Sequence, residues 1–382
     1  MLFRVTTFIL LFNFSLLVSA QTIRTDGALI NISTTSTVAT PGSISIQGNG
    51  GILNSGHLYL KGGWTNNGLG LLDSLPGTVD FNGNVSQMVG GNNITNFAFL
   101  RLSNPSGIIL SNNINIGETL IFTDGKITTG PYEVRMTNVP ANAIAGANTS
   151  RYINGNLRVA FNSSVQSQYK YEIGSTVYAP VNLRLYNIAS AGSMLAYTNS
   201  GPASLENFPL PGASGIDPFA RVDRHWALAQ SGLVFQEFDA EFDFSQTINT
   251  GSAQDYIIRH NDPLTGWQSE STSNNGTTAT GVLRDGLFVI GELANTAIDE
   301  GTTAIIQLYP NPSRGKFFLR GLEQGEYQLS LFDITGREIF EKLYHSNGNV
   351  VLEFDALQLS PGNYVLKAQS TKHISNIQFI VQ

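Results

Sequence analysis

The chain has 382 residues, of which 13% are charged and 41% hydrophobic, and it contains 39 glycines and no cysteine. Without cysteine it cannot form disulfides, use a thiolate for catalysis or carry the acylated cysteine of a bacterial lipoprotein. The formal net charge of −7 disfavours nucleic acids and anionic membranes as partners, because such polyanions bind clustered Lys and Arg. The length allows two or three domains, and the glycine-rich, weakly charged composition favours an all-β chain.

Residues 1–20 have the pattern of a signal peptide. An apolar run follows Arg4, and small residues precede the expected cleavage between Ala20 and Gln21. The run is interrupted by Asn13 and is shorter than the roughly 20 apolar residues that a membrane-spanning helix needs. We therefore expect export, with no transmembrane segment in the mature chain.

Residues 21–165 show weak repetition at a spacing of about 20 residues, which is the size of a solenoid coil. Asparagine- and glycine-rich steps, such as residues 54–56 and 66–68, separate the repeated segments and suit the corners of a coil. The pattern predicts a parallel β-helix or β-solenoid, with an irregular β-sandwich as the alternative. The strand-like segments are centred near Tyr59, Val79, Leu100, Leu120, Val134 and Leu157.

Residues 166–293 contain longer alternating strands, which predict a β-sandwich. In residues 237–244 the period-two alternation directs apolar side chains to the core and acidic side chains to the opposite face. Neighbouring carboxylates on that face lie about 6.6 Å apart, which is wide for a shared calcium ion unless loops add oxygens. A solvated face and a calcium site both stay open, and no other cofactor is expected. The acidic row consists of Glu237, Asp239, Glu241 and Asp243.

Two tryptophans are candidates for stacking on sugar rings. Trp64 lies in a glycine-rich segment and Trp267 directly follows Gly266, so either ring could present a flat apolar face beside Asn and Thr side chains. The alternative is that both rings fill the core, because large aromatic side chains mostly stabilise a fold by burying their area.

The histidines form no catalytic or metal-binding spacing. We expect His225 to face outward beside a core Trp226, and His260 to lie in a turn. The sequence has no Gly-x-Ser-x-Gly, His-Glu-x-x-His or phosphate-loop motif. Residues from distant loops could still converge, as the paired carboxylates of glycosidases do, so enzymatic activity stays open although its absence is favoured.

Residues 294–307 lack apolar periodicity and predict a linker. Residues 308–382 form a further module, in which strands alternate around residues 327–331 and 364–368. Its landmarks are Tyr309, Pro310, Asn311, Pro312, Gly336, Arg337, Gly362 and Tyr364. In this order, the landmarks resemble the C-terminal sorting domain that sends Bacteroidetes proteins through the type IX secretion system, also called Por secretion.

The resemblance implies an immunoglobulin-like β-sandwich that the type IX machinery reads at the outer membrane and that is commonly removed. The protein would pass through the periplasm and then be attached to surface polysaccharide or released. Residues 62–68, 79–83 and 122–127 resemble parts of uncharacterised β-rich surface proteins of the same bacteria. Ser74, between Asp73 and Leu75, is similar to the site at which such proteins receive O-linked sugars.

These patterns predict a secreted or cell-surface protein with a structural or adhesin-like role and without evident catalytic activity. The alternative is a secreted carbohydrate-binding or carbohydrate-active protein. A binder or hydrolase needs a concave site with convergent polar groups, whereas a scaffold needs a continuous core with covered ends. Partners of either kind would be extracellular glycans or proteins, in addition to the type IX machinery.

Overall fold

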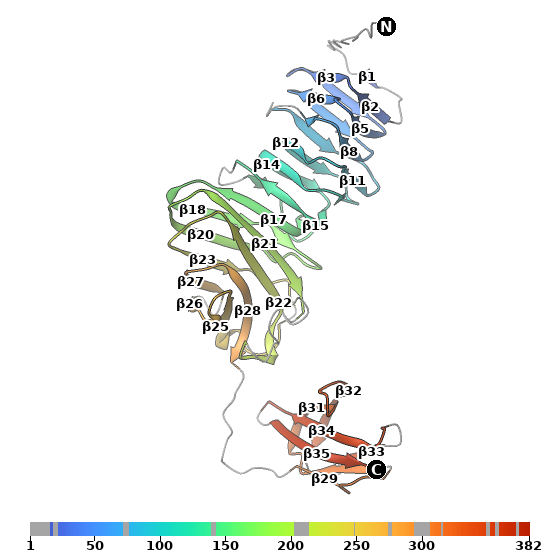
Figure 1. The fold of residues 1–382 in the computed structure, drawn as a ribbon, viewed down its shortest axis with the longest axis vertical. Helices are drawn as coiled ribbons and strands as arrows, with labels where there is room; N and C mark the ends of the chain where they lie inside the picture. Colours follow the sequence, from blue (N-terminus) through green and yellow to red (C-terminus); the bar gives the residue numbers. More distant parts are fainter. Residues whose placement is uncertain are drawn as a thin grey trace. The chain divides into compact units, whose positions relative to one another are not determined.

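The computed structural model describes residues 16–17, 22–71, 76–138, 143–201, 214–247, 249–273, 277–293, 306–314, 316–348, 352–355, 359–371 and 374–382. The chain divides into two compact units, with the boundary between Ala294 and Asn295. Both units consist of β-strands (Figure 1). Within the described ranges, no helix is long and apolar enough to span a membrane.

The first part of unit 1 is a stack of parallel strands that forms the three faces of a β-solenoid (Figure 1). One face contains β2 (Thr22–Asp26), β5 (Ser43–Gln47), β8 (Trp64–Asn67), β11 (Gln87–Gly90), β13 (Ile108–Leu110), β15 (Ile127–Met136), β17 (Ile153–Phe161) and β19 (Ile173–Gly174). The second contains β4 (Thr37–Thr40), β7 (His57–Leu60), β10 (Thr78–Phe81), β12 (Thr95–Ser103), β14 (Ile114–Asp124) and β16 (Ile144–Ala145), and β1 (Leu16–Leu17) pairs with β4. The third begins with β3 (Leu29–Ile32), β6 (Gly51–Asn54) and β9 (Gly70–Leu71).

Each coil adds one side chain to a ladder that runs along the solenoid core. Leu58 in β7 is in register with Val79 in β10, followed by Leu100 in β12 and Leu120 in β14. All four side chains are at most 1% exposed. The spacing in the sequence therefore corresponds to one coil, and the predictions of an all-β chain and a β-solenoid are confirmed.

Asparagine side chains connect neighbouring coils at the corners. The Nδ2 of Asn54 donates to the carbonyl of Thr78 at 3.2 Å, and its Oδ1 accepts from the amide of Gly56 at 3.2 Å. Asn66 repeats the pattern at another corner, donating to the carbonyl of Ile94 at 3.1 Å. These amides satisfy backbone groups that the corner removes from the strand ladders.

The second part of unit 1 is a β-sandwich of two antiparallel layers. One layer has the strand order β18 (Ser164–Tyr171), β20 (Val181–Ile188), β23 (Glu237–Phe242), β27 (Thr278–Val282) and β26 (Ser271–Ser273). The other contains β21 (Gly192–Ser200), β22 (Ile216–Ser231), β28 (Gly286–Leu293), β24 (Ile257–Asp262) and β25 (Gly266–Ser269), with the short 3₁₀ helix η3 (Ala253–Asp255) before β24. Rings meet between the layers, where Phe242 lies 5.1 Å from Trp226 and 5.2 Å from Phe288.

The solenoid and the sandwich share one sheet and one core. Strand β17 pairs in parallel with β15 and antiparallel with β21, so the hydrogen-bonded ladder continues from the last coil into the sandwich. One cluster of buried apolar residues extends from Ile32 to Ile290, and Ala227 and Leu287 form a small second cluster beside Trp267. The division predicted after residue 165 is thus a change in strand pairing within one compact unit.

Unit 2 consists of two small antiparallel sheets around a separate core. One sheet contains β29 (Gln307–Tyr309), β30 (Lys316–Arg320) and β33 (Leu352–Asp355). The other has the order β32 (Glu338–Asn347), β31 (Gln324–Asp333), β34 (Gly362–Gln369) and β35 (Ile374–Val381). The core includes Phe317, Leu331, Leu366 and Phe379, which are at most 1% exposed.

Candidate functional site

The acidic row of β23 lies on the outer face of the sandwich. Phe238, Ala240 and Phe242 on the same strand are at most 1% exposed, whereas Glu241 and Asp243 are exposed and the other two carboxylates are half-buried. The alternation that the sequence predicts is therefore present in the structure.

Hydrogen bonds hold the acidic row to the two neighbouring strands, β20 and β27. Asp239 accepts from the hydroxyl of Tyr186 at 2.7 Å and from the amide of Gly281 at 3.0 Å. Glu241 accepts from the amide side chain of Asn182 at 3.4 Å. Among the described residues, no three His, Cys, Asp or Glu side chains are grouped so that they could hold a metal ion. The calcium hypothesis stays a prediction.

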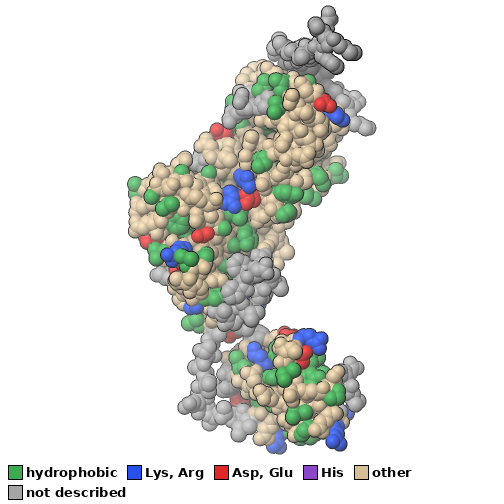
Figure 2. Space-filling view, viewed as in Figure 1, with side chains coloured by type: hydrophobic (Ala, Val, Ile, Leu, Met, Phe, Trp, Pro, Cys, Tyr) green, Lys and Arg blue, Asp and Glu red, His purple; other side chains and the backbone are tan. Residues whose placement is uncertain are grey.

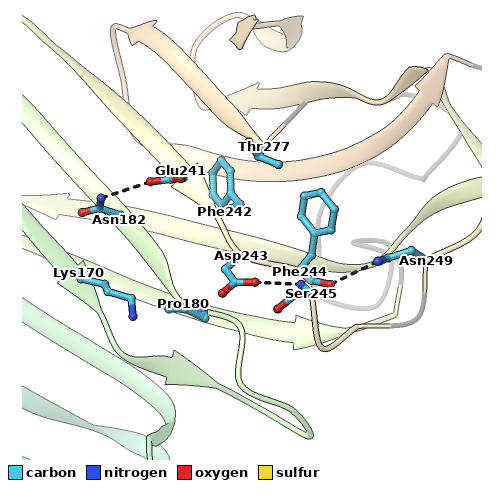
Figure 3. Close-up of a pocket in the computed structure, with 10 residues that line it drawn as sticks. All are labelled: Lys170, Pro180, Asn182, Glu241, Phe242, Asp243, Phe244, Ser245, Asn249 and Thr277. Carbon is cyan, nitrogen blue, oxygen red and sulfur yellow. Dashed lines mark hydrogen bonds between the residues drawn. The ribbon is translucent and has the colours of Figure 1, made fainter. Parts of the chain in front are cut away.

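The end of the acidic row borders an open hollow of about 440 Å³ (Figure 3). Glu241 lines it from β23 and Asp243 from the residue that follows β23, and Lys170 lines the same hollow from β18. The backbone amide of Ser245 donates to Asp243 at 2.9 Å. The hollow therefore brings an ammonium group, two carboxylates and amide side chains to one place.

The ammonium of Lys170 is engaged at one end of this hollow. Its Nζ lies 3.2 Å from Glu172 and 2.9 Å from the hydroxyl of Tyr178. Burial, together with a hydrogen bond to Glu172, raises the pKa of the Tyr178 phenol far above its usual range, so this phenol stays neutral. The sequence did not single out Lys170, because its partners come from the segment that follows β18.

The two tryptophans occupy different environments. Trp64 is 1% exposed, and its indole Nε1 donates to the hydroxyl of Thr95 at 3.0 Å. Its ring has no free face on which a sugar could stack, so the predicted stacking role of Trp64 is wrong. Trp267 is half-buried and packs against Ala227 and Leu287, and its stacking role stays a prediction.

The histidines of the sandwich are buried. Trp226 is in the core as predicted, but His225 is only 1% exposed, with its Nδ1 3.2 Å from the carbonyl of Gly201. The expectation that His225 faces outward is wrong, because both faces of β22 are covered at this point.

His260 lies within β24 and not in a turn, as the sequence suggested. Its Nδ1 is 2.9 Å from the Glu270 carboxylate and its Nε2 is 3.2 Å from the carbonyl of Asp285. The ring stacks on Phe288 at 4.4 Å between centroids. These contacts hold β24 to the neighbouring strand β28 and to Glu270, which lies between β25 and β26, and they give His260 a packing role.

Three predicted residues lie outside the described ranges. They are Ala20, Gln21 and Ser74. The signal cleavage between Ala20 and Gln21 and the O-glycosylation of Ser74 therefore stay predictions.

The landmarks at the start of unit 2 fasten its first segment to its last strand. Asn311, between Pro310 and Pro312, donates from Nδ2 to the carbonyl of Gln378 at 3.1 Å and accepts at Oδ1 from the amide of Ile380 at 2.9 Å. Both partners belong to β35, so the side chain takes the place of a neighbouring strand.

Tyr309 and Tyr364 support the two sheets of unit 2. The guanidinium of Arg320 lies 5.2 Å from the centroid of the Tyr309 ring. The hydroxyl of Tyr364, two residues after Gly362, donates to the carbonyl of Ser360 at 2.6 Å.

The turn between β31 and β32 is built around Asp333. Its carboxylate accepts from the backbone amide of Thr335 at 2.9 Å and from the guanidinium of Arg337 at 3.0 Å. Gly336 has a φ of 83°, which favours glycine. The Thr335 hydroxyl and these donors lower the pKa of the Asp333 carboxyl.

Residues 307–382 match the family of the secretion system C-terminal sorting domain. This unit is a type IX sorting domain. The match begins one residue before the start that the sequence predicted, and it confirms the resemblance. No curated protein matches the chain. With its sorting domain, the protein is exported by the type IX machinery and reaches the cell surface or the medium.

Proposed function

We propose that residues 22–293 form an adhesive scaffold that the sorting domain delivers to the bacterial surface. The observation that supports this proposal best is the unbroken sheet from the solenoid through β17 and β21 into the sandwich. A body whose main core is continuous resists deformation when its surface is held by a partner. Stacked coils also present an extended surface, which suits broad contacts.

The outer surface of the solenoid supports contact with uncharged partners. Figure 2 shows a face of unit 1 with mostly uncharged side chains and small, separate groups of charges. On adjacent coils Met88 and Ile109 are in register and are 61% and 45% exposed. We call these two side chains the apolar strip. Exposed apolar side chains in one place favour association with another surface.

An adhesion assay with intact cells tests the proposed function. Cells with a working type IX system would display the chain, and their attachment to immobilised extracellular matrix and to one another would be compared with cells that lack it. We expect display to increase attachment, and the double variant Met88→Lys with Ile109→Lys to reduce it. Leu264→Lys is the matched control, because Leu264 is 76% exposed in a turn of the sandwich. Normal display without any gain in attachment would exclude the adhesive role.

A further inference from the structure

The first coil of the solenoid leaves its side of the core partly open. It consists of β2, β3 and β4, at the N-terminal end of unit 1 (Figure 1). Ile23, Ile30 and Val38 pack against the core from these strands but are only half-buried. The residues in register with them on the next coil are each 1% exposed, and these are Ile44, Ile52 and Leu58. Within the described residues, the first coil thus lacks the cover that the end of a solenoid needs.

The strands of the first coil also have edges on which a further strand can pair. Among the described strands, β2 pairs only with β5 and β3 only with β6. The three strands contain neither proline nor lysine, which commonly protect such edges. The edge of β4 accepts a strand, because β1 pairs with it and places Leu16 opposite Val38. The cleavage predicted between Ala20 and Gln21 removes β1 and vacates this edge.

The charges on β2 suit pairing with a second copy of the same strand. The guanidinium of Arg24 lies 3.3 Å from the carboxylate of Asp26, and both side chains are 65% exposed. When two β2 strands lie antiparallel with Thr25 at the two-fold axis, Arg24 of each copy is opposite Asp26 of the other. Side chains directly opposite each other on one face of a sheet interact. The strand is therefore electrostatically complementary to itself.

The other end of the solenoid does not offer the same surface. There β17 pairs with β21, which continues the sheet into the sandwich. A second copy cannot stack head to tail on this face, so the open end of one copy meets the open end of the other. Contact between two identical surfaces closes as a pair with two-fold symmetry. Under this symmetry β3 of each copy lies beside β4 of the other, and all three edges find a strand.

We propose that the mature chain forms a head-to-head dimer through the first coils of two solenoids. In this dimer β2 pairs antiparallel with β2 of the second copy, and the contact covers Ile23, Ile30 and Val38. The inference goes beyond the proposed function, because it assigns the open end to a second copy of the chain and not to an adhesion partner. The attachment of cells and the association of the chain are measured separately, so either can fail alone.

Sedimentation velocity on the exported protein tests the dimer, after mass spectrometry has established its first residue. We expect the native chain to dimerise. Arg24→Glu or Asp26→Arg alone should raise the dissociation constant at least about tenfold, because each variant places like charges opposite each other. An equal mixture of the two variants should form a dimer with one copy of each, since unlike charges then oppose at every position.

The matched control is Lys61→Glu, a charge reversal at an exposed residue of the next coil. It should leave the dissociation constant unchanged, and circular dichroism should show native strand content in all the variants. A native chain that stays monomeric at every concentration would overturn the dimer. Equal dissociation constants for the native chain and both single reversals would overturn it as well. Failure of the mixture to associate would overturn the proposed pairing of β2.

Discussion

Asn104 illustrates how one buried amide holds two coils of the solenoid together. Its side chain is 0% exposed, and its Nδ2 donates to the carbonyl of Val85 at 2.7 Å and to the side chain of Gln87 at 2.9 Å. Its Oδ1 accepts from the amide of Ser106 at 2.9 Å. We expect Asn104→Ala to lower the free energy of unfolding by about 2–3 kcal/mol, because it leaves buried partners without hydrogen bonds. Urea denaturation followed by circular dichroism measures this loss.

The control for Asn104 is Asn96, which lies on the outside of the same solenoid. Asn96 is exposed and accepts a hydrogen bond from Asn115 at 2.7 Å. Its replacement by Ala should change stability by no more than about 0.5 kcal/mol. Similar losses for both variants would show that burial of the corner amide has no special role.

Trp64 and Trp267 should differ in what they contribute to stability. Trp64 packs at 5.5 Å from the ring of Phe97 and is fully enclosed, so Trp64→Ala should destabilise the chain by about 3–5 kcal/mol. Trp267 is half-buried, and Trp267→Ala should cost clearly less. Thermal melting of both variants makes the comparison. A Trp64→Ala chain as stable as the native one would contradict the core assignment.

At the scale of strands, β15 and β17 are joined by a charged cluster on the solenoid surface. Glu133 in β15 accepts from the Nη2 of Arg158 in β17 at 2.9 Å and from the Nε of Arg135 at 2.7 Å. Burial opposes ionisation of Glu133, but these hydrogen bonds outweigh it and hold the pKa of the carboxyl below its ordinary value of 4.5. The ionised cluster therefore stabilises the pairing of the last coils.

The pH dependence of Glu133→Gln follows from this lowered pKa. A carboxyl whose folded pKa is depressed stabilises the fold above its unfolded pKa, and the stabilisation is lost as the pH falls through the folded pKa. At pH 7 we expect Glu133→Gln to be less stable than the native chain by about 2 kcal/mol. The difference should shrink as the pH falls below 4.5. Denaturant titrations across this range measure it, and a difference that stays constant with pH would refute the role of ionised Glu133.

At the scale of the whole chain, the two units have separate cores. The core of the sorting domain contains residues from Leu308 to Val381, and none of the residues of the first core belongs to it. We expect calorimetry to resolve two unfolding transitions for the full chain. A chain that ends at Leu293 should keep the unfolding transition of unit 1 at the same temperature. The same truncated chain should stay in the periplasm, because it lacks the sorting domain. A single transition that disappears on truncation would show that the units depend on each other.

Local patterns in the sequence are enough to predict the fold class and the sorting domain, and they favour a solenoid over an irregular β-sandwich in residues 21–165. Strand alternation is a local property, as residues 237–244 show, and the coil repeat appears as a fixed spacing between Val79, Leu100 and Leu120. Several sorting landmarks lie where the backbone requires a particular residue, as Gly336 does in its turn with a φ of 83°. Asn311, for example, serves as the partner of a strand edge.

Which side chains are enclosed and which residues meet depend on how the whole unit packs. Alternation assigns a strand two faces but does not say whether both are covered, and for this reason His225 was expected outside and is 1% exposed. The same limit applied to Trp64, whose burial depends on neighbouring coils. A second hollow, lined by Thr137 and Gln166, depends on where β17 ends and β18 crosses to the other layer. Such contacts between distant segments arise from packing of the whole unit, which has no counterpart in the local pattern of the sequence.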